Sequence, residues 1–185
     1  AESWRVNLFD TGIDTQTGGR LLRLKSRLDS GTFMLTYGDG VSDVDVEALL
    51  DFHRSHGRLA TVTAVRPPAR FGGLIMSGDF VDHFTEKPVS GEGWINGGFL
   101  VLEPGIFDYL SSDRDSLEAD ALERVAADGQ LAAYRHDGFW QCMDTLRDKH
   151  YLQRLWDEDR APWRTWDRDV QQPRLRIGPT KAKAA

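Results

Sequence analysis

Two aspartates stand where a hydrophobic stretch of this sequence passes into a polar turn. Asp39 lies between two glycines in FMLTYGDGV (33–41), and Asp144 follows the apolar residues of FWQCMDT (139–145), directly before an expected helix. If both stretches are strands of one α/β sheet, both carboxylates reach the edge of the sheet where such folds bind ligands. Mg²⁺ takes hard oxygen ligands and leaves its other positions to water and substrate. The sequence therefore predicts a magnesium site that acts on a phosphorylated substrate.

Each aspartate also has a purely structural interpretation. Asp39 could belong to an Asp-Gly turn, and Asp144 could cap the N-terminus of the helix that follows it. Glu86 and Lys87 have two interpretations as well. Neighbouring residues of a strand face opposite ways, so this carboxylate could bind sugar hydroxyls while the ammonium binds a phosphate. An exposed charged turn explains the same two residues equally well.

Three further patterns are ambiguous in the same way. The glycines of INGGF (95–99) indicate close approach of a ligand or another backbone inside a strand, or else a β-bulge. TGGR (17–20) opens a helix, and Arg20 could reach a triphosphate at that positive helix end, although short glycine-rich turns before helices are common. His53 and His56 have no third ligand nearby in the sequence, so we interpret them as surface histidines.

Composition argues against several classes of protein. The 185 residues suggest one domain, and the net charge of -6 argues against a nucleic-acid partner. A single cysteine rules out an internal disulfide and a cysteine-based zinc cage, and it fits a reducing compartment. Neither a bilayer-spanning apolar run of about 20 residues nor a signal-peptide pattern is present, so no membrane partner is expected. A cytoplasmic protein is the resulting expectation.

Hydrophobic periodicity predicts alternating strands and helices, which favours an α/β fold with parallel pairing and a doubly wound sheet. Strands are expected at 4–10, 32–37, 59–65, 94–102 and from 131 onward, with a hairpin that turns at residues 77–78. Helices are expected at 17–31, 42–57, 116–129 and 146–156, with a shorter one after Pro104. Residues 1–160 would form the domain. Residues 161–185 are Pro-rich and basic, and we expect an extension with a flexible end.

Five motifs in a fixed order carry a family resemblance: TYGDG, RFG, EKP, INGGF and FWQCMDTLRDK. In this order they resemble the sugar-1-phosphate nucleotidyltransferases, and DTGIDTQTGGRL and APWRTW make the resemblance strongest to those that use CTP and glucose 1-phosphate. The resemblance runs from about residue 4 to residue 166. It implies a Rossmann-like, doubly wound mixed sheet, Mg²⁺ as cofactor, and a homo-oligomer in the full-length form. The implied product is CDP-glucose, a precursor of dideoxyhexoses in O-antigen and other surface polysaccharides.

The resemblance also implies roles for individual residues. The implied metal ligands, which are also the catalytic residues, are Asp39 and Asp144. The implied nucleotide contacts are Thr15, Arg20 and Gly38. The implied contacts to the sugar phosphate are Gly72, Glu86, Lys87 and Asn96.

One part of the family pattern has no counterpart in this sequence. The family begins with a strand and a glycine-rich loop that cradles the nucleotide phosphates, so this chain is expected to be N-terminally truncated, the C-terminal two-thirds of such an enzyme. Without that segment we expect it to be marginally stable, to self-associate and to be inactive alone. Two alternatives stay open: a related transferase that uses UTP or dTTP, and a non-catalytic fragment that only binds sugar phosphate.

Overall fold

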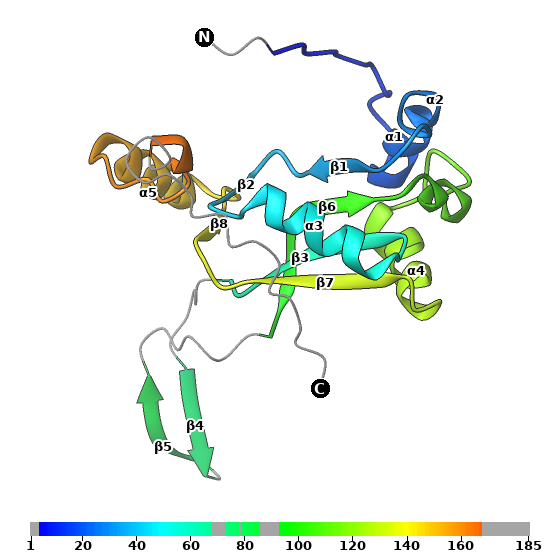
Figure 1. Cartoon of the computed structure of the whole chain (residues 1–185). Coiled ribbons are helices and arrows are strands. Elements are labelled where there is room, and N and C mark those ends of the chain that lie inside the picture. The colour runs from blue at the N-terminus through cyan, green and yellow to red at the C-terminus, as the bar shows by residue number, and fades with distance from the viewer. Residues whose placement is uncertain (1–3, 68–72, 78, 86–92, 168–185) are drawn as a thin grey trace, which may run out of the picture.

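A four-stranded mixed sheet forms the centre of the molecule (Figure 1). The computed structural model describes residues 4–67, 73–77, 79–85 and 93–167. The strands lie in the order β1-β6-β3-β7, where β1 is Phe33–Thr36, β3 is Ala60–Val65, β6 is Ile95–Leu102 and β7 is Leu131–His136. Strand β6 is antiparallel to both β1 and β3, whereas β3 and β7 are parallel. The predicted mixed α/β fold is confirmed, but parallel pairing is limited to β3 and β7 because β6 inserts between β1 and β3.

The helices follow the predicted order with local differences. They are α1 (Thr17–Arg23), α2 (Lys25–Leu28), α3 (Val46–His56), α4 (Glu123–Ala127) and α5 (Leu146–Asp157), with 3₁₀ helices η1 (Pro104–Tyr109) and η3 (Thr165–Asp167) and the π-helix η2 (Leu117–Leu122). The helix expected at 17–31 is therefore two short helices that meet at Leu24. Helix α3 begins four residues after the expected start at residue 42, because its cap is Asp45, whose carboxylate accepts from the Ala48 amide at 3.0 Å.

The core lies between the central strands and the helical elements that follow them in the chain. Strand β6 is buried almost continuously from Gly97 to Leu102, as expected for a strand covered on both faces. Buried side chains of the cluster around it come from β6, η1, η2 and α4, among them Leu100, Leu102, Ile106, Phe107, Leu117 and Val125. Burial of each such side chain stabilises the fold by about 1.5–3 kcal/mol, so this cluster holds β6 in place.

Residues 4–10 differ from the prediction. Their apolar residues alternate as in a strand, but the structure gives them no strand, and the segment runs away from the sheet (Figure 1). The side chains of Trp4, Val6 and Leu8 are 79%, 72% and 91% exposed. A strand needs a neighbour to complete its backbone hydrogen bonds, and no described strand lies beside this segment.

The histidines of α3 also differ from the prediction. His53 is only 2% exposed. Its Nδ1 lies 2.8 Å from the Thr61 hydroxyl and its Nε2 lies 3.0 Å from a Glu103 carboxylate oxygen. His56 is half-buried, and its Nε2 lies 2.8 Å from the same Thr61 hydroxyl. The surface interpretation is therefore wrong for His53, because partners on β3 and after β6 satisfy both of its ring nitrogens.

Two small antiparallel pairs complete the fold. Strands β4 (Gly73–Ser77) and β5 (Phe80–Thr85) form the predicted hairpin, which lies apart from the main sheet in Figure 1. Strands β2 (Gly40–Ser42) and β8 (Trp140–Cys142) form the second pair, which we call the β2–β8 ribbon. Within the described ranges, the structure contains no helix with the length and apolar character needed to span a bilayer.

Candidate active site

The β2–β8 ribbon brings the two predicted aspartates together. Gly40 pairs with Cys142, and one step further the Met143 amide donates to the Asp39 carbonyl oxygen at 2.8 Å. Asp39 directly precedes β2 and Asp144 follows β8, so the antiparallel pairing places both at the same end of the ribbon. The two aspartates therefore lie close together, and a ribbon of two short strands places them there rather than the carboxyl ends of parallel strands.

Both aspartates line one cavity of about 420 Å³, within the usual size range of small-ligand sites. Its walls combine carboxylate, amide, phenol and indole groups with apolar side chains. The lining residues are Tyr37, Asp39, Gly40, Pro67, Ile95, Asn96, Gly97, Trp140, Cys142 and Asp144. Such a lining suits a small polar ligand that also has an apolar face, as a sugar ring does.

The donor set of the cavity is compatible with Mg²⁺. Asp39 and Asp144 supply two carboxylates, and the Cys142 thiol donates to Asp144 Oδ2 at 3.2 Å. Asp144 does not cap α5, since Thr145 forms a capping box there with Asp148. Among the described residues, no group of three His, Cys, Asp or Glu side chains could hold a metal ion by itself. A cation here would need water and substrate oxygens as further ligands, which is how proteins commonly bind Mg²⁺.

A chain of hydrogen bonds runs from the cavity to η2. Asn96 Nδ2 donates to the Tyr37 hydroxyl at 3.0 Å, and that hydroxyl donates to Glu118 Oε1. The Thr17 hydroxyl donates to Glu118 Oε2 at 2.8 Å. Burial, together with the bond to Glu118, raises the pKa of Tyr37, so its phenol stays neutral. Burial also favours a neutral Glu118, but the bonds from Tyr37 and Thr17 outweigh it and hold the pKa of Glu118 below its usual range.

The two glycines of the 95–99 motif make room for neighbouring side chains. Gly98 has φ 76°, and a Cβ atom there would lie 2.7 Å from Tyr37 Cδ2. A Cβ atom on Gly97 would lie 2.7 Å from Val65 Cγ1. The pairing of β3 with β6 also shifts register at Val62/Ala64, which is the irregularity that the sequence left as an alternative. Close packing across the sheet therefore explains both glycines without any ligand.

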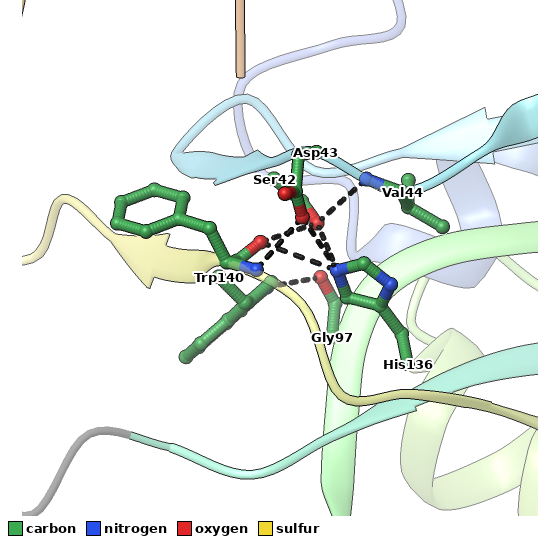
Figure 2. A network of polar contacts seen from close by, with 7 residues as sticks. Ser42, Asp43, Val44, Gly97, His136 and Trp140 are labelled. Atoms are coloured by element: carbon green, nitrogen blue, oxygen red, sulfur yellow. Dashed lines mark hydrogen bonds and ion pairs between the residues drawn. The ribbon is translucent and has the colours of Figure 1, made fainter. Parts of the chain in front are cut away.

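The other end of the β2–β8 ribbon is held by a polar network (Figure 2). Asp43 Oδ1 accepts from the Phe139 amide at 2.7 Å and lies 3.0 Å from His136 Nε2. The Ser42 hydroxyl donates to the Phe139 carbonyl at 2.8 Å and lies 3.2 Å from the same His136 nitrogen. We call Ser42, Asp43, His136 and Phe139 the latch. In a nucleophilic triad, the serine and the aspartate contact opposite nitrogens of the histidine ring. In the latch, Ser42 and Asp43 both contact His136 Nε2, so the latch is not such a triad.

The latch and the Tyr37–Glu118 bond were missed by sequence reasoning. Asp43 lay inside the helix expected at 42–57, and neither His136 nor Glu118 stood out among ordinary polar residues. Their partners lie 81 to 97 residues away along the chain, so local spacing carries no signal of them. In Figure 2, the Trp140 side chain lies beside the latch, and its Nε1 donates to the Gly97 carbonyl at 2.8 Å, which links the ribbon to β6.

Two of the three predicted nucleotide contacts, Thr15 and Arg20, lie away from the cavity that the aspartates line. Thr15 is buried, and Arg20 donates to Thr11 Oγ1 at 2.7 Å and to the Ile13 carbonyl at 3.3 Å. Neither belongs to the cavity lining, and α1 lies at the opposite end of β1 from the ribbon (Figure 1). Gly38 adjoins Asp39, and a Cβ atom there would have no neighbour within 4 Å, so its backbone is accessible.

The predicted sugar-phosphate contacts are only partly described. Asn96 lines the cavity, as the prediction requires. Gly72, Glu86 and Lys87 lie outside the described residues. Their roles stay predictions.

Comparison with known proteins finds relatives by sequence and a shared fold. A family model described as nucleotidyl transferase matches residues 20–154. A glucose-1-phosphate cytidylyltransferase of Salmonella typhi is 48% identical over 167 residues, which cover 90% of this chain and 65% of the relative. A mannose-1-phosphate guanyltransferase of Hypocrea jecorina is 31% identical over 161 residues, or 82% of this chain and 44% of the relative. The crystal structure of HddC from Yersinia pseudotuberculosis shares the fold, with a TM-score of 0.57, 22% identity and coverage of 77% of this chain and 63% of that one.

Proposed function

Because this chain belongs to the nucleotidyl transferase family, we propose that it forms the metal- and sugar-phosphate-binding part of a sugar-1-phosphate nucleotidyltransferase. In the proposed reaction a phosphate oxygen of glucose 1-phosphate attacks the α-phosphorus of CTP. The bond between the α- and β-phosphates breaks, and pyrophosphate leaves with its electron pair. The product is CDP-glucose, which would serve the synthesis of dideoxyhexoses for surface polysaccharide.

The observation that carries this proposal is the convergence of Asp39, Asp144 and Asn96 on one cavity. The two carboxylates would hold Mg²⁺, which when bound supplies positive charge beside the phosphates. Asn96 would hydrogen-bond a sugar hydroxyl. The apolar groups of Pro67 and Trp140 would lie against the ring and exclude water from it. Catalysis of this kind depends on positioning and electrostatics, so no nucleophilic side chain is required.

The choice of CTP and glucose 1-phosphate as the substrates rests on fewer observations than the reaction type does. It rests on the 48% identity with the Salmonella typhi relative, which is named for that reaction. The guanyltransferase relative acts, by its name, with another base and another sugar. We therefore expect the purified protein to prefer CTP, and transfer from UTP or dTTP at an equal or higher rate would contradict that choice.

A second candidate function is binding of sugar phosphate without catalysis. The chain spans 65% of the length of the Salmonella typhi relative, so groups that act on the nucleotide in that relative can lie outside the matched part. Pyrophosphate release separates the two candidates. A chain that binds glucose 1-phosphate, but releases pyrophosphate only when the unmatched part of that relative is added, would be the binding part of a divided enzyme.

The test of the metal site uses calorimetry with glucose 1-phosphate, with and without Mg²⁺, followed by the pyrophosphate assay. We expect Asp39→Asn and Asp144→Asn each to abolish the Mg²⁺ effect, and the double variant to be no worse than either, because both change one shared site. Asp51→Asn is the matched control, since Asp51 lies on α3 with a 79% exposed side chain. Binding that is independent of Mg²⁺, or a single variant with unchanged Mg²⁺ dependence, would refute the shared site.

A further inference from the structure

The Asn96 side-chain amide has one defined orientation. The Gly98 backbone N–H lies 2.9 Å from Asn96 Oδ1, and a backbone N–H can only donate. The accepting atom must therefore be the amide oxygen. The amide nitrogen then faces the Tyr37 hydroxyl at 3.0 Å, where it can only donate.

This orientation determines where the Tyr37 proton goes. Since the Tyr37 oxygen accepts from Asn96, its own hydrogen donates to Glu118 Oε1. The other carboxylate oxygen, Oε2, already accepts from the hydroxyls of Thr17 at 2.8 Å and Ser116 at 3.0 Å. Each group in this chain donates to the next one, from Asn96 to Tyr37 and from Tyr37 to Glu118, and hydrogen bonds in such a chain strengthen each other. The Glu118 carboxylate therefore strengthens the bond that Tyr37 accepts from the Asn96 amide.

Two hydrogen-bonding positions of Asn96 are left for a ligand. An amide has two N–H donors and an oxygen with two lone pairs, and one of each is used inside the protein. The remaining N–H and the remaining lone pair belong to a residue that lines the cavity. A hydroxyl both donates and accepts, so one ligand hydroxyl can satisfy both positions.

We propose that Glu118 and Tyr37 are positioning residues that fix the Asn96 amide so that it binds a ligand hydroxyl as donor and acceptor together. That the hydroxyl belongs to the sugar of glucose 1-phosphate rests on the proposed function. Without the Tyr37 hydroxyl or the Glu118 charge, only the Gly98 N–H still holds the amide, so the direction of its NH₂ group is less restricted and the pattern that it presents to the cavity is weakened.

The first test observes the amide directly and needs no activity. In the ¹⁵N-labelled chain, the Asn96 side-chain NH₂ resonances are assigned by their loss in Asn96→Asp. We expect Tyr37→Phe and the near-isosteric Glu118→Gln both to shift these resonances. Tyr109→Phe is the matched control, because the Tyr109 hydroxyl donates to Asp128 Oδ2 at 2.7 Å outside the cavity lining. Unchanged Asn96 resonances in both variants would overturn the proposal.

The second test measures binding of glucose 1-phosphate and of inorganic phosphate by calorimetry. We expect Tyr37→Phe and Glu118→Gln each to weaken glucose 1-phosphate binding about tenfold, the effect of one ordinary hydrogen bond. The double variant should lose no more than the single ones, because the residues act in series, and the affinity for inorganic phosphate should stay within about twofold.

The outcomes separate this inference from the proposed function. If the variants shift the Asn96 resonances but leave the affinity for glucose 1-phosphate unchanged, the positioning role is wrong. It is also wrong if the double variant loses affinity by the product of the two single losses. A wild-type chain that binds no glucose 1-phosphate would contradict the proposed function and the sugar part of the inference together. The Asn96 resonances would then still decide whether Tyr37 and Glu118 fix the amide.

Discussion

Removal of the Asp43 carboxylate should open the ribbon that carries both cavity aspartates. Its side chain is 21% exposed, and it accepts from the Phe139 amide at 2.7 Å while lying 3.0 Å from His136 Nε2. Asp43→Ala leaves that partly buried amide without its acceptor, which costs about 1–3 kcal/mol, while Ser42 still contacts the His136 ring. We expect a loss of about 2 kcal/mol in the free energy of unfolding, or about 4–8 °C in Tm for a chain of this size.

Urea denaturation measures the global loss, and amide hydrogen exchange locates it. The Met143 amide, which donates to the Asp39 carbonyl at 2.8 Å, should exchange about 30-fold faster if about 2 kcal/mol is lost from a local opening of the ribbon. Asp51→Ala is the control, because Asp51 and Arg54 form an exposed pair at 3.8 Å, and such pairs contribute about 0–1 kcal/mol. If Asp43→Ala costs no more than Asp51→Ala and Met143 exchange is unchanged, the latch does not hold the ribbon.

Three further predictions concern pH, backbone strain and association. Burial and His53 lower the pKa of His56; burial opposes ionisation of Glu103, but hydrogen bonds from Thr32 and His53 outweigh it and lower that pKa too. Both groups thus bind fewer protons in the folded state than in the unfolded state, so protonation favours unfolding. The urea midpoint should fall as the pH drops below 6.5, the usual pKa of histidine, and again below 4.5, the usual pKa of glutamate. Equal midpoints at about pH 7.5 and 4 would contradict this. Gly98→Ala should cost about 1–3 kcal/mol, since φ is 76° and the added Cβ meets Tyr37, whereas Gly31→Ala, with open space around it, should cost less than half as much in the same urea assay. The exposed Trp4, Val6 and Leu8 should make the chain self-associate, and light scattering should show a smaller mass for Leu8→Lys, whereas a monodisperse wild-type monomer would refute it.

The aspartates of the cavity could be predicted because their signal is local. Each stands between an apolar stretch and a polar turn, and a carboxylate in that position rarely serves packing alone. The element that unites them could not be predicted. Strands β2 and β8 have three residues each, which is too short for a hydrophobic period, and their register depends on contacts between distant parts of the chain.

Burial of polar side chains was the weakest part of the prediction. The helical pattern of α3 does not distinguish a buried His53 from an exposed one, because its burial depends on Glu103, 50 residues further along. The alternation at residues 4–10 is typical of a strand, but a strand also requires a neighbour that sequence alone does not supply. Tyr37 and Glu118 show the same limit, since neither residue type is unusual at its own position.

The sequence separation across the β2–β8 ribbon also affects the order of folding. Ser42 bonds to Phe139, 97 residues away, so the ribbon closes a loop that includes most of the central sheet. Closing a long loop has an entropic cost, and contacts between distant residues generally form late, after the parts between them are ordered. The cavity should therefore be assembled after β3, β6 and β7 have paired. During refolding, recovery of ligand binding should lag behind recovery of the β-sheet signal, and ribbon variants should accelerate unfolding more than they slow folding.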